Sequence, residues 1–307
     1  MPELPEVETV CRGLNRTTLH QPIQGGDVLL HRTIAHPVLV SEFLAGLQGC
    51  QIQQWHRRGK YLLAEIVYPS NAGEGQFPSA AAGWLGVHLR MTGQLLWIDP
   101  MEPLQKHTRV RLFFADHKEL RFVDQRTFGQ MWYVPPGQAP ENVITGLRQL
   151  GPEPFSDNFS LSYLVQQLKH RQRPIKNALL DQALVAGIGN IYADEALFLS
   201  GIHPNTCCTA LNRTVLDRLR SNIIQVLQAS IEAQGTTFST FRNVEGINGN
   251  YGQVAWVYAR DGEACRNCQT VIQRMRLAGR SAHFCPNCQT GKQHLRKPRV
   301  RTRSDEG

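Results

Sequence analysis

The sequence begins MPELPEVE at residues 1–8, and this stretch predicts where the fold and its chemistry start. Proline is common in the first turn of a helix, and the helix dipole favours acidic residues there, so an ordinary helix start is the simplest interpretation. A second interpretation applies if Met1 is removed, because Pro2 would then be a secondary amine at the end of the chain. An α-amino group has a pKa near ~7.7 to 8.0, so part of it is neutral and nucleophilic at physiological pH. Glu3 could then exchange protons with the substrate.

Two kinds of hydrophobic pattern divide the chain. Val7, Val10, Cys11 and Leu14 recur at helical spacing and predict one amphipathic helix behind the N-terminal stretch. From there to residue 134, short apolar or β-branched runs between turn residues predict an antiparallel sandwich or barrel. The predicted strands are residues 27–34, 51–57, 61–68, 84–89, 94–98, 110–114, 120–123 and 130–134. Helical periodicity then returns and predicts helices over residues 160–171, 175–184, 191–200 and 211–233.

These patterns predict an α+β fold. An N-terminal helix with an antiparallel β-sandwich would form one domain, and a helical domain followed by a small cysteine-bearing β-hairpin would form the rest. The connection between the two domains holds five prolines and three glycines, which is typical of a linker. Two other stretches rich in small residues, 69–83 and 235–252, predict a hairpin tip and a flexible loop. The boundaries that we predict are 1–134 for the catalytic helix and β-sandwich domain, 135–158 for the interdomain linker, 159–253 for the helical domain, 254–289 for the hairpin and 290–307 for a basic disordered tail.

Composition and charge restrict the classes of partner and compartment. The formal net charge is +8, and half of it lies in the tail 290–307, so the charge of the body favours a nucleic-acid partner only weakly. The start of the chain carries three glutamates and no apolar signal segment. No uncharged apolar run approaches the ~18 residues that a membrane span requires. We therefore expect a cytoplasmic protein, in which eight cysteines favour metal binding over disulfides.

The strongest local signal is a pair of Cys-x-x-Cys motifs near the C-terminus. Cys265 and Cys268 form the first, and Cys285 and Cys288 form the second, with sixteen residues between the pairs. Four thiolates close a tetrahedral site and leave no open position for catalysis, so the spacing predicts one structural Zn²⁺ ion. The residues between the pairs suit a β-hairpin with cations at its tip, and so small a segment needs the metal to become ordered.

Four shorter motifs carry candidate functional side chains, although each is weak alone. Residues 187–192, GIGNIY, place a tight turn before a helix, whose free N–H groups favour a phosphate. Residues 57–61, RRGKY, gather three cations at a strand start, and residues 88–93, HLRMTG, end another strand with a methionine. Arg126 and Phe128 are two residues apart, so on an extended segment both would project to one side. A surface arginine beside a core phenylalanine is the alternative.

Taken together, the motifs resemble those of one family, the bacterial formamidopyrimidine-DNA glycosylases, which are helix-two-turn-helix enzymes of base-excision repair. The resemblance extends in order from residue 2 to about residue 289 and rests on PELPE at 2–6, RGKYL at 58–62, HLxMxG at 88–93, KH at 106–107, RxFG at 126–129, GIGNIY at 187–192 and GRS at 279–281. It implies a helix-two-turn-helix domain over 159–253, with a loop that covers the lesion. The stretch 69–83 and the tail lie outside the family pattern.

The resemblance implies roles for individual residues. Pro2 looks like the nucleophile that displaces the damaged base, Glu3 looks like the proton donor, and Lys60 is similar to a lysine that contacts phosphate and assists β-elimination. Asn190 and Arg280 resemble the pair that grips the phosphates flanking the extruded nucleotide, and the second elimination is linked to that arginine. The other implied DNA contacts are His107 and Arg171, together with Met91, Arg126 and Phe128 as the trio that fills the gap left by the flipped nucleotide.

The implied function is that of a bifunctional DNA glycosylase and AP lyase. Such an enzyme excises oxidised purines, namely 8-oxoguanine and formamidopyrimidines, through a Schiff base on Pro2 and then cleaves the strand by β,δ-elimination. Its partner would be double-stranded DNA, and we expect a monomer that works on the nucleoid in the cytoplasm and not at a membrane. One alternative is an endonuclease VIII-like glycosylase for oxidised pyrimidines, against which Leu4 and the complete gap-filling trio argue. A second is a non-catalytic DNA-binding protein, which would have no use for Pro2, Glu3 and Lys60 together.

Replacement of Cys268 by serine is expected to release the zinc and abolish DNA binding, because metal binding supplies roughly 10 to 16 kcal/mol to the folding of zinc-finger peptides. The N-terminal β-sandwich should stay folded. Metal analysis, a gel-shift assay with a lesion-containing duplex and circular dichroism measure these three properties. A Cys268→Ser variant that still bound DNA would contradict the structural role of the hairpin.

Overall fold

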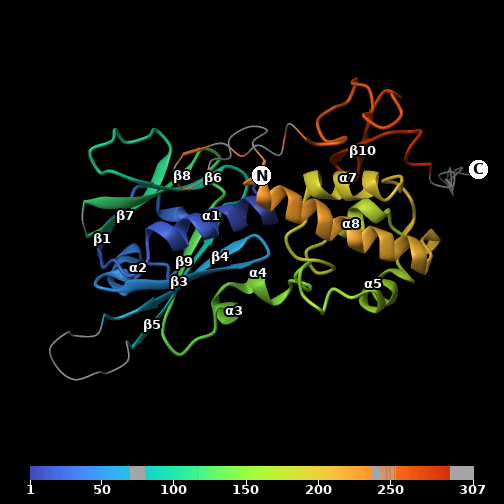
Figure 1. Ribbon diagram of the computed structural model, residues 1–307. Helices are drawn as coiled ribbons and strands as arrows, with labels where there is room; N and C mark the ends of the chain where they lie inside the picture. The colour runs from blue at the N-terminus through green and yellow to red at the C-terminus, as the bar shows by residue number, and fades with distance from the viewer. Residues whose placement is uncertain are drawn as a thin grey trace, which may run out of the picture.

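The computed structural model describes residues 1–69, 80–115, 117–236, 244, 246, 247, 249, 252 and 254–290. The predicted tip 69–83, the loop 235–252 and the tail 290–307 lie largely outside these residues. The described parts form a β-sandwich domain and a helical domain, and a two-stranded hairpin lies on the helical domain (Figure 1). The predicted α+β fold is confirmed.

In the first domain, helix α1, Leu4–Thr17, packs against both sheets of the sandwich. Its buried face carries Val7, Val10 and Leu14, the positions that the helical spacing predicted. One sheet has the strand order β1-β7-β8-β6 and the other β2-β9-β5-β4-β3, and every neighbouring pair is antiparallel except β2 with β9. The strands are β1 Ile23–Val28, β2 Ile34–His36, β3 Gln51–Arg58, β4 Tyr61–Val67, β5 Ala81–His88, β6 Gly93–Ile98, β7 Thr108–Phe114, β8 Lys118–Asp124 and β9 Gln130–Val134.

The prediction of a single strand over 27–34 is wrong. The chain leaves β1 at Val28, makes a 3₁₀ turn, η1 His31–Thr33, and enters the short strand β2. A helix that the sequence did not predict, α2 Val40–Leu47, follows. Only Phe43 and Leu47 of this helix are buried. Two apolar positions are too few to reveal a helical period in a region where strand patterns dominate.

The segment predicted as a linker is ordered and packs on the sandwich. It contains two short helices, α3 Pro140–Val143 and α4 Thr145–Arg148. Ile144, between the helices, and Leu147, in α4, are buried against the outer face of the larger sheet. Proline and glycine here shape turns of a fixed connection, because tertiary contacts supply the burial that the local composition does not predict.

One carboxylate fastens this connection to the β3–β4 turn. Glu153 accepts hydrogen bonds from Arg57 Nη1 at 2.6 Å, from Arg58 Nη1 at 2.9 Å and from the backbone N–H of Gly59 at 2.6 Å. Arg57 and Arg58 of the RRGKY motif therefore join the sandwich to the connection.

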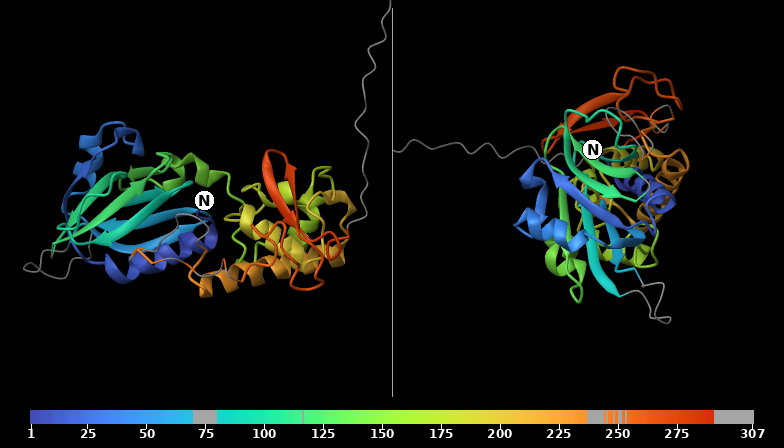
Figure 2. Two further views of the ribbon diagram at one scale, coloured as in Figure 1. Left: turned by 90° about the horizontal axis from the view of Figure 1, so that it is seen from above. Right: turned by 90° about the vertical axis from the view of Figure 1, so that its left-hand side faces the viewer.

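The helices of the second domain surround α7, Asn190–Leu199, whose residues from Ile191 to Phe198 are all buried. Around it lie α5 Leu161–Leu168, α6 Ile175–Leu179, the 3₁₀ turn η2 Cys208–Ala210 and the long helix α8 Arg213–Glu232. All four predicted helices form, and the second ends five residues early because the chain turns there to bury Leu184 and Val185. Figure 2 shows α8 lying along the whole domain and reaching α1.

The cysteine-bearing hairpin consists of β10 Gln273–Leu277 and β11 Arg280–Phe284, paired antiparallel as predicted, and it packs on α7. Its turn needs glycine, because Gly279 has a φ of +83°. Within the described part of the chain, no helix is long and apolar enough to cross a membrane.

Replacement of Glu153 by alanine is expected to lower the free energy of unfolding by about 2 to 4 kcal/mol, because Arg57 would be left buried without this partner. Urea unfolding followed by fluorescence measures the loss. The matched control is Glu65→Ala. Glu65 lies 3.8 Å from His56, and the two side chains are 40% and 41% exposed, so this substitution should change the free energy of unfolding by less than about 0.5 kcal/mol. Equal effects of the two substitutions would contradict the role given to Glu153.

Candidate active site

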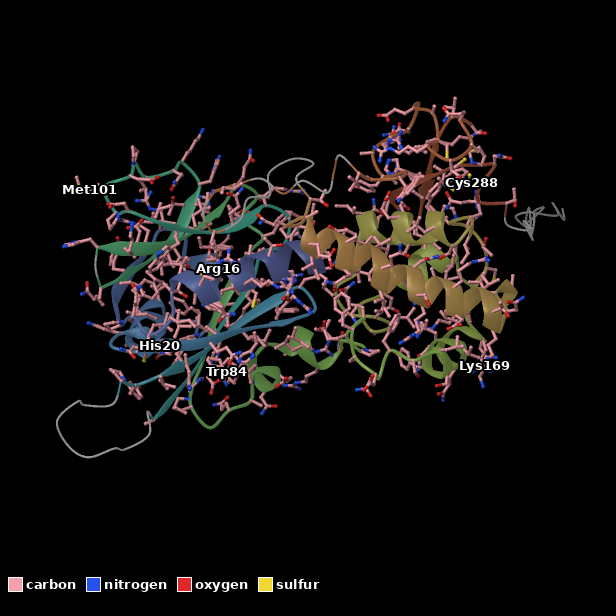
Figure 3. All side chains as sticks on the ribbon, viewed as in Figure 1. Arg16, His20, Trp84, Met101, Lys169 and Cys288 are labelled. Carbon is pink, nitrogen blue, oxygen red and sulfur yellow. The ribbon has the colours of Figure 1, made fainter. Side chains whose placement is uncertain are left out.

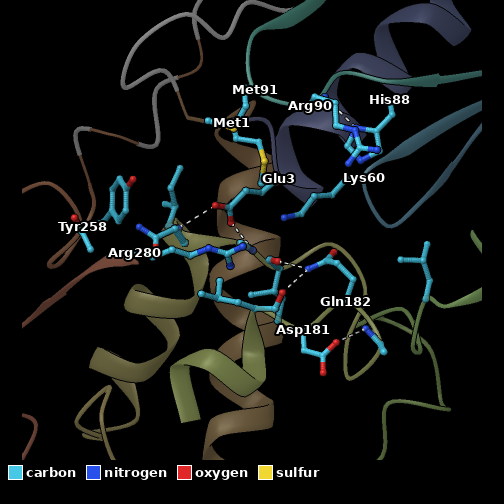
Figure 4. A pocket seen from close by; sticks show the side chains of 18 of the residues that line it. Met1, Glu3, Lys60, His88, Arg90, Met91, Asp181, Gln182, Tyr258 and Arg280 are labelled. Atoms are coloured by element: carbon cyan, nitrogen blue, oxygen red, sulfur yellow. Dashed lines mark hydrogen bonds between the residues drawn. The ribbon is translucent and has the colours of Figure 1, made fainter. Parts of the chain in front are cut away.

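A cavity of about 870 Å³ opens where the two domains and the hairpin meet. Its wall is formed by the start of the chain, the β3–β4 turn, the loop between β5 and β6, the N-terminus of α7 and the hairpin. Figure 4 shows Glu3, Lys60 and Arg280 pointing toward one another from three of these elements. Met1 also lines the cavity, and the adjoining Pro2 is buried. The predicted residues in the lining are Glu3, Lys60, Met91, Asn190 and Arg280.

The Glu3 carboxylate occupies the N-terminus of α7. It accepts hydrogen bonds from the backbone N–H groups of Gly189 at 2.8 Å, Ile191 at 3.0 Å and Tyr192 at 3.4 Å. Residue 189 must be glycine, because a Cβ there would lie 2.3 Å from the Glu3 carboxyl carbon. The prediction that this turn holds a phosphate is therefore wrong: the anion that these N–H groups bind comes from the protein itself.

Lys60 lies in the β3–β4 turn, where it is 7% exposed. The turn places Gly59 at a φ of +55° and tight against Leu150 of the connection and Ala186 of the second domain. Burial lowers the pKa of the Lys60 ammonium, and the carboxylates of Glu3 and Glu6 act in the opposite direction. A lysine with a lowered pKa loses its proton more readily, which suits it to acid–base work.

Behind Glu3, Glu6 is 1% exposed and accepts three hydrogen bonds. The donors are the backbone N–H of Glu3 at 2.8 Å, the Tyr192 hydroxyl at 2.5 Å and the backbone N–H of Thr236 at 2.9 Å. Burial, followed by repulsion from Glu3, raises the pKa of Glu6 to about 7. Sequence analysis gave Glu6 no role, because its burial depends on contacts with α7 and α8.

Asn190 and Arg280 line the same cavity from α7 and β11. The Asn190 side chain hydrogen-bonds the Tyr258 hydroxyl, while its Oδ1 atom is buried without a hydrogen-bond partner among the described residues. The Arg280 side chain is exposed. The structure thus brings a half-buried amide and an exposed guanidinium to one cavity, as phosphate binding would need.

The gap-filling residues lie on two loops that one buried aspartate joins. Asp124 accepts hydrogen bonds from the Thr92 hydroxyl at 2.5 Å and from the backbone N–H of Gly129 at 2.7 Å, which ties the loop of Met91 to the turn of Arg126 and Phe128. The prediction of an extended segment at 126–128 is wrong, since Thr127 has a φ of +58°. The two side chains share one side because the Arg126 guanidinium stacks 5.0 Å from the centre of the Phe128 ring. Phe128 is 53% exposed.

His107 and Arg171, the other two predicted DNA contacts, lie outside the cavity lining. His107 precedes β7 and its Nδ1 atom lies 3.2 Å from Arg109. Arg171 follows α5 and pairs with Asp181 at 3.3 Å, with 28% of its side chain exposed.

Sequence analysis missed His88, which also lines the cavity. Burial, followed by the nearby charges of Arg90 and Lys60, lowers the pKa of His88 to about 3, so the imidazole is neutral at physiological pH. Its Nδ1 atom accepts the backbone N–H of Arg90 at 2.9 Å, which leaves the proton on Nε2 as a donor. Its place at the end of a strand, three residues before Met91, was the available signal.

The four cysteines come together at the base of the hairpin, at the end of the helical domain away from the sandwich (Figure 3, Cys288). Their Sγ atoms lie within 4.8 Å of one another, with separations of 3.9 Å between Cys265 and Cys288 and 3.4 Å between Cys268 and Cys285. A tetrahedral ZnS₄ centre with bonds of about 2.3 Å has edges of about 3.8 Å, so the cluster fits the predicted structural Zn²⁺.

Family models match all three folded parts of the chain. The model for the formamidopyrimidine-DNA glycosylase N-terminal domain matches residues 1–131, and that for the formamidopyrimidine-DNA glycosylase H2TH domain matches residues 150–242. A third, described as a zinc finger found in FPG and IleRS, matches residues 262–291. The chain belongs to the formamidopyrimidine-DNA glycosylase family. The resemblance inferred from the motifs is confirmed.

Individual relatives support this membership. The formamidopyrimidine-DNA glycosylases of Nostoc sp. and Nostoc punctiforme are each 64% identical to this chain, over 92% of it and over 98% and 94% of their own lengths. Among solved structures, a complex of Lactococcus lactis Fpg with DNA containing an abasic site has a TM-score of 0.83 and 33% identity, covering 94% of this chain and 100% of that one. A complex of a point mutant of the same Lactococcus lactis protein with DNA containing Fapy-dG gives equal values.

Stability should depend on pH through Glu6. Because its pKa is about 7 in the folded protein and 4.5 ordinarily, the folded state holds an extra proton between these values, and the free energy of unfolding falls as pH rises through this window. Glu6→Gln removes the titration. We expect the variant, relative to the unmodified protein, to gain about 2 to 3 kcal/mol between pH 5 and pH 8 in urea unfolding. A difference that stays constant with pH would contradict the raised pKa, and the exposed Glu65→Gln serves as the control.

Proposed function

We propose that the protein is a bifunctional DNA glycosylase and AP lyase that removes oxidised purines from double-stranded DNA. The observation that carries this proposal is the convergence of Glu3, Lys60 and Arg280 on the start of the chain, in a cavity of a size suited to an extruded nucleotide. Similar structures are complexes with DNA that contains Fapy-dG, an abasic site or carbocyclic 8-oxo-G, which supports this lesion range.

Pro2 would act as the nucleophile once Met1 is removed. Because Met1 lines the cavity, its loss would free the Pro2 nitrogen at the cavity wall. The secondary amine would attack C1′ of the damaged nucleotide, and the electron pair of the glycosidic bond would leave with the base. The iminium forms when the amine loses its proton and the C1′–O4′ bond of the sugar opens, with a proton delivered to O4′. It has no N–H proton to lose, which keeps it an electron sink for the elimination steps that follow.

Glu3 and Lys60 would handle the protons. Glu3 would give a proton to the sugar, and the three N–H groups at the start of α7 would then stabilise the carboxylate that remains. Lys60, whose pKa burial lowers, would contact phosphate and assist removal of a sugar proton in β-elimination. Arg280 would assist the second elimination.

Asn190 and Arg280 would grip the phosphates on either side of the extruded nucleotide. Turning the Asn190 amide end for end would let the Tyr258 hydroxyl donate to Oδ1 and direct Nδ2 at a phosphate. Oδ1, which has no partner among the described residues, would then be satisfied. The Nε2–H group of His88 would supply a further neutral donor from the opposite wall.

Extrusion of the nucleotide costs a few kcal/mol of lost stacking and leaves a gap in the duplex that must be filled. Met91 and Phe128 would supply apolar wedges, and Arg126 would hydrogen-bond the orphaned base. The exposure of Phe128 and the rigid turn that Asp124 fixes under it support this assignment. His107 and Arg171 would contact the backbone outside the cavity.

The lesion range and the compartment belong to the same proposal. A similar structure is a complex of wild-type Lactococcus lactis Fpg with DNA containing an oxidised pyrimidine, so pyrimidine lesions need to be compared directly with 8-oxoguanine. We place the enzyme in the cytoplasm, on the DNA of the nucleoid, as a monomer.

Borohydride trapping on a duplex with 8-oxoguanine opposite cytosine, followed by mass spectrometry, tests the mechanism. We expect an adduct on a peptide that begins at Pro2. Glu3→Gln should bind the duplex and lose excision by a factor of about 10² to 10⁴, whereas Glu8→Gln, on the same helix but paired with Arg57, should excise normally.

Each other outcome has a distinct meaning. An adduct on Lys60 would mean that the nucleophile is misassigned. Intact binding without any adduct, repeated on oxidised-pyrimidine duplexes, would favour a non-catalytic DNA-binding protein. Full excision by Glu3→Gln would remove Glu3 from the mechanism.

A further inference from the structure

A buried ion pair lies outside the cavity lining and has no part in the chemistry described above. Lys176 Nζ, from α6, lies 2.6 Å from Asp194 Oδ1, from α7, and the two side chains are 1% and 0% exposed. Desolvation of both charges offsets much of their attraction, so a buried pair is weak evidence for stability by itself. What else the two side chains bind is therefore informative.

Both members of the pair hold strand β11 directly after Arg280. Lys176 Nζ donates to the backbone oxygen of Ser281 at 2.5 Å. Asp194 Oδ2 accepts the backbone N–H of His283 at 3.0 Å and lies 3.2 Å from His283 Nδ1. The first and third residues after Arg280 are thus fixed to α6 and α7, at the end of the strand that enters the cavity.

The same stretch of α7 also holds Asn190 in place. Asp194 follows Asn190 by four residues on α7, which places both on one face of the helix. The neighbouring Glu195 accepts the backbone N–H groups of residues 256 to 258, and Tyr258 in turn hydrogen-bonds Asn190. The contacts that locate Arg280 and those that locate Asn190 therefore meet within one turn of α7.

The cysteine end of the hairpin, away from Arg280, is held in a different way. Phe198, Val257 and Ile272 pack with the cysteines, and Gln289 donates to the backbone oxygen of Ile202 at 2.8 Å. These contacts lie around the metal ligands and do not reach the turn at Ala278 and Gly279. Next to Arg280, the ion pair ties β11 to α6 and α7, in addition to the pairing of β11 with β10 and the ring contact between Tyr258 and His283.

We propose that the Lys176–Asp194 pair is a positioning device that sets the distance between Arg280 and Asn190, so that both engage phosphates flanking the extruded nucleotide. This inference rests on the proposed function, in which Arg280 binds phosphate. Neither Lys176 nor Asp194 touches the substrate.

A double-substitution cycle tests the proposal. The dissociation constant of a duplex with a tetrahydrofuran abasic-site analogue would be measured at several salt concentrations for Asp194→Asn, Arg280→Ala and the two combined. We expect each single substitution to weaken binding about fivefold to tenfold and to reduce the slope of log K against log salt by about 0.9, the value for one lost phosphate contact. The combined variant should bind within about twofold of Arg280→Ala.

The outcomes separate the two levels of inference. If Asp194→Asn weakens binding equally with and without Arg280, the positioning role is overturned while the proposed function stands. If Arg280→Ala leaves both affinity and slope unchanged, the assignment of Arg280 to phosphate fails, and the positioning role fails with it.

Two further variants control for folding and charge. Lys176→Met combined with Asp194→Leu replaces the pair by apolar side chains and leaves no buried charge unpaired, so it should fold and retain zinc yet lose the same affinity. Full affinity in that variant would overturn the proposal. Asp27→Asn makes the same charge change at the partly exposed contact with Arg111 and should bind DNA normally.

Discussion

The contact between the Glu3 carboxylate and the first N–H groups of α7 is the interaction on which the rest of the structure depends. It joins residues 186 positions apart in sequence at 2.8 Å, and it is where the first helix of the sandwich meets the central helix of the second domain (Figure 1). A helix N-terminus stabilises an anion in this position. The proposed proton donor is therefore also a domain joint, so the cavity beside it forms only when both domains are in place.

Burial makes the charges around this joint depend on one another. Glu3 raises the pKa of Glu6 behind it, and both carboxylates oppose the effect of burial on the pKa of Lys60. The protonation of Glu6 and that of Lys60 therefore depend on each other.

Helix α7 connects the parts of the molecule because it is buried on nearly every face. Its first turn binds Glu3, its middle binds the zinc hairpin through Asp194 and Glu195, and its apolar side chains pack with α8. A helix with so many partners cannot show a strong polar face, so its sequence lacks the amphipathic pattern of a surface helix. The hairpin and the start of the chain, which are distant in sequence, reach one cavity because both are fixed to this helix.

The sequence by itself determined the features that depend on neighbouring residues. Short apolar or β-branched runs located β3 to β9, helical spacing located α1 and the helices of the second domain, and the Cys-x-x-Cys spacing identified a cluster that fits zinc. Only the tertiary structure decided which group occupies the N-terminus of α7, that Glu153 binds Arg57 and Arg58, and that the segment of Arg126 and Phe128 is a turn. The physical reason is range: periodicity records how a segment buries one face, whereas a buried charge is placed by a partner that the chain supplies from far away.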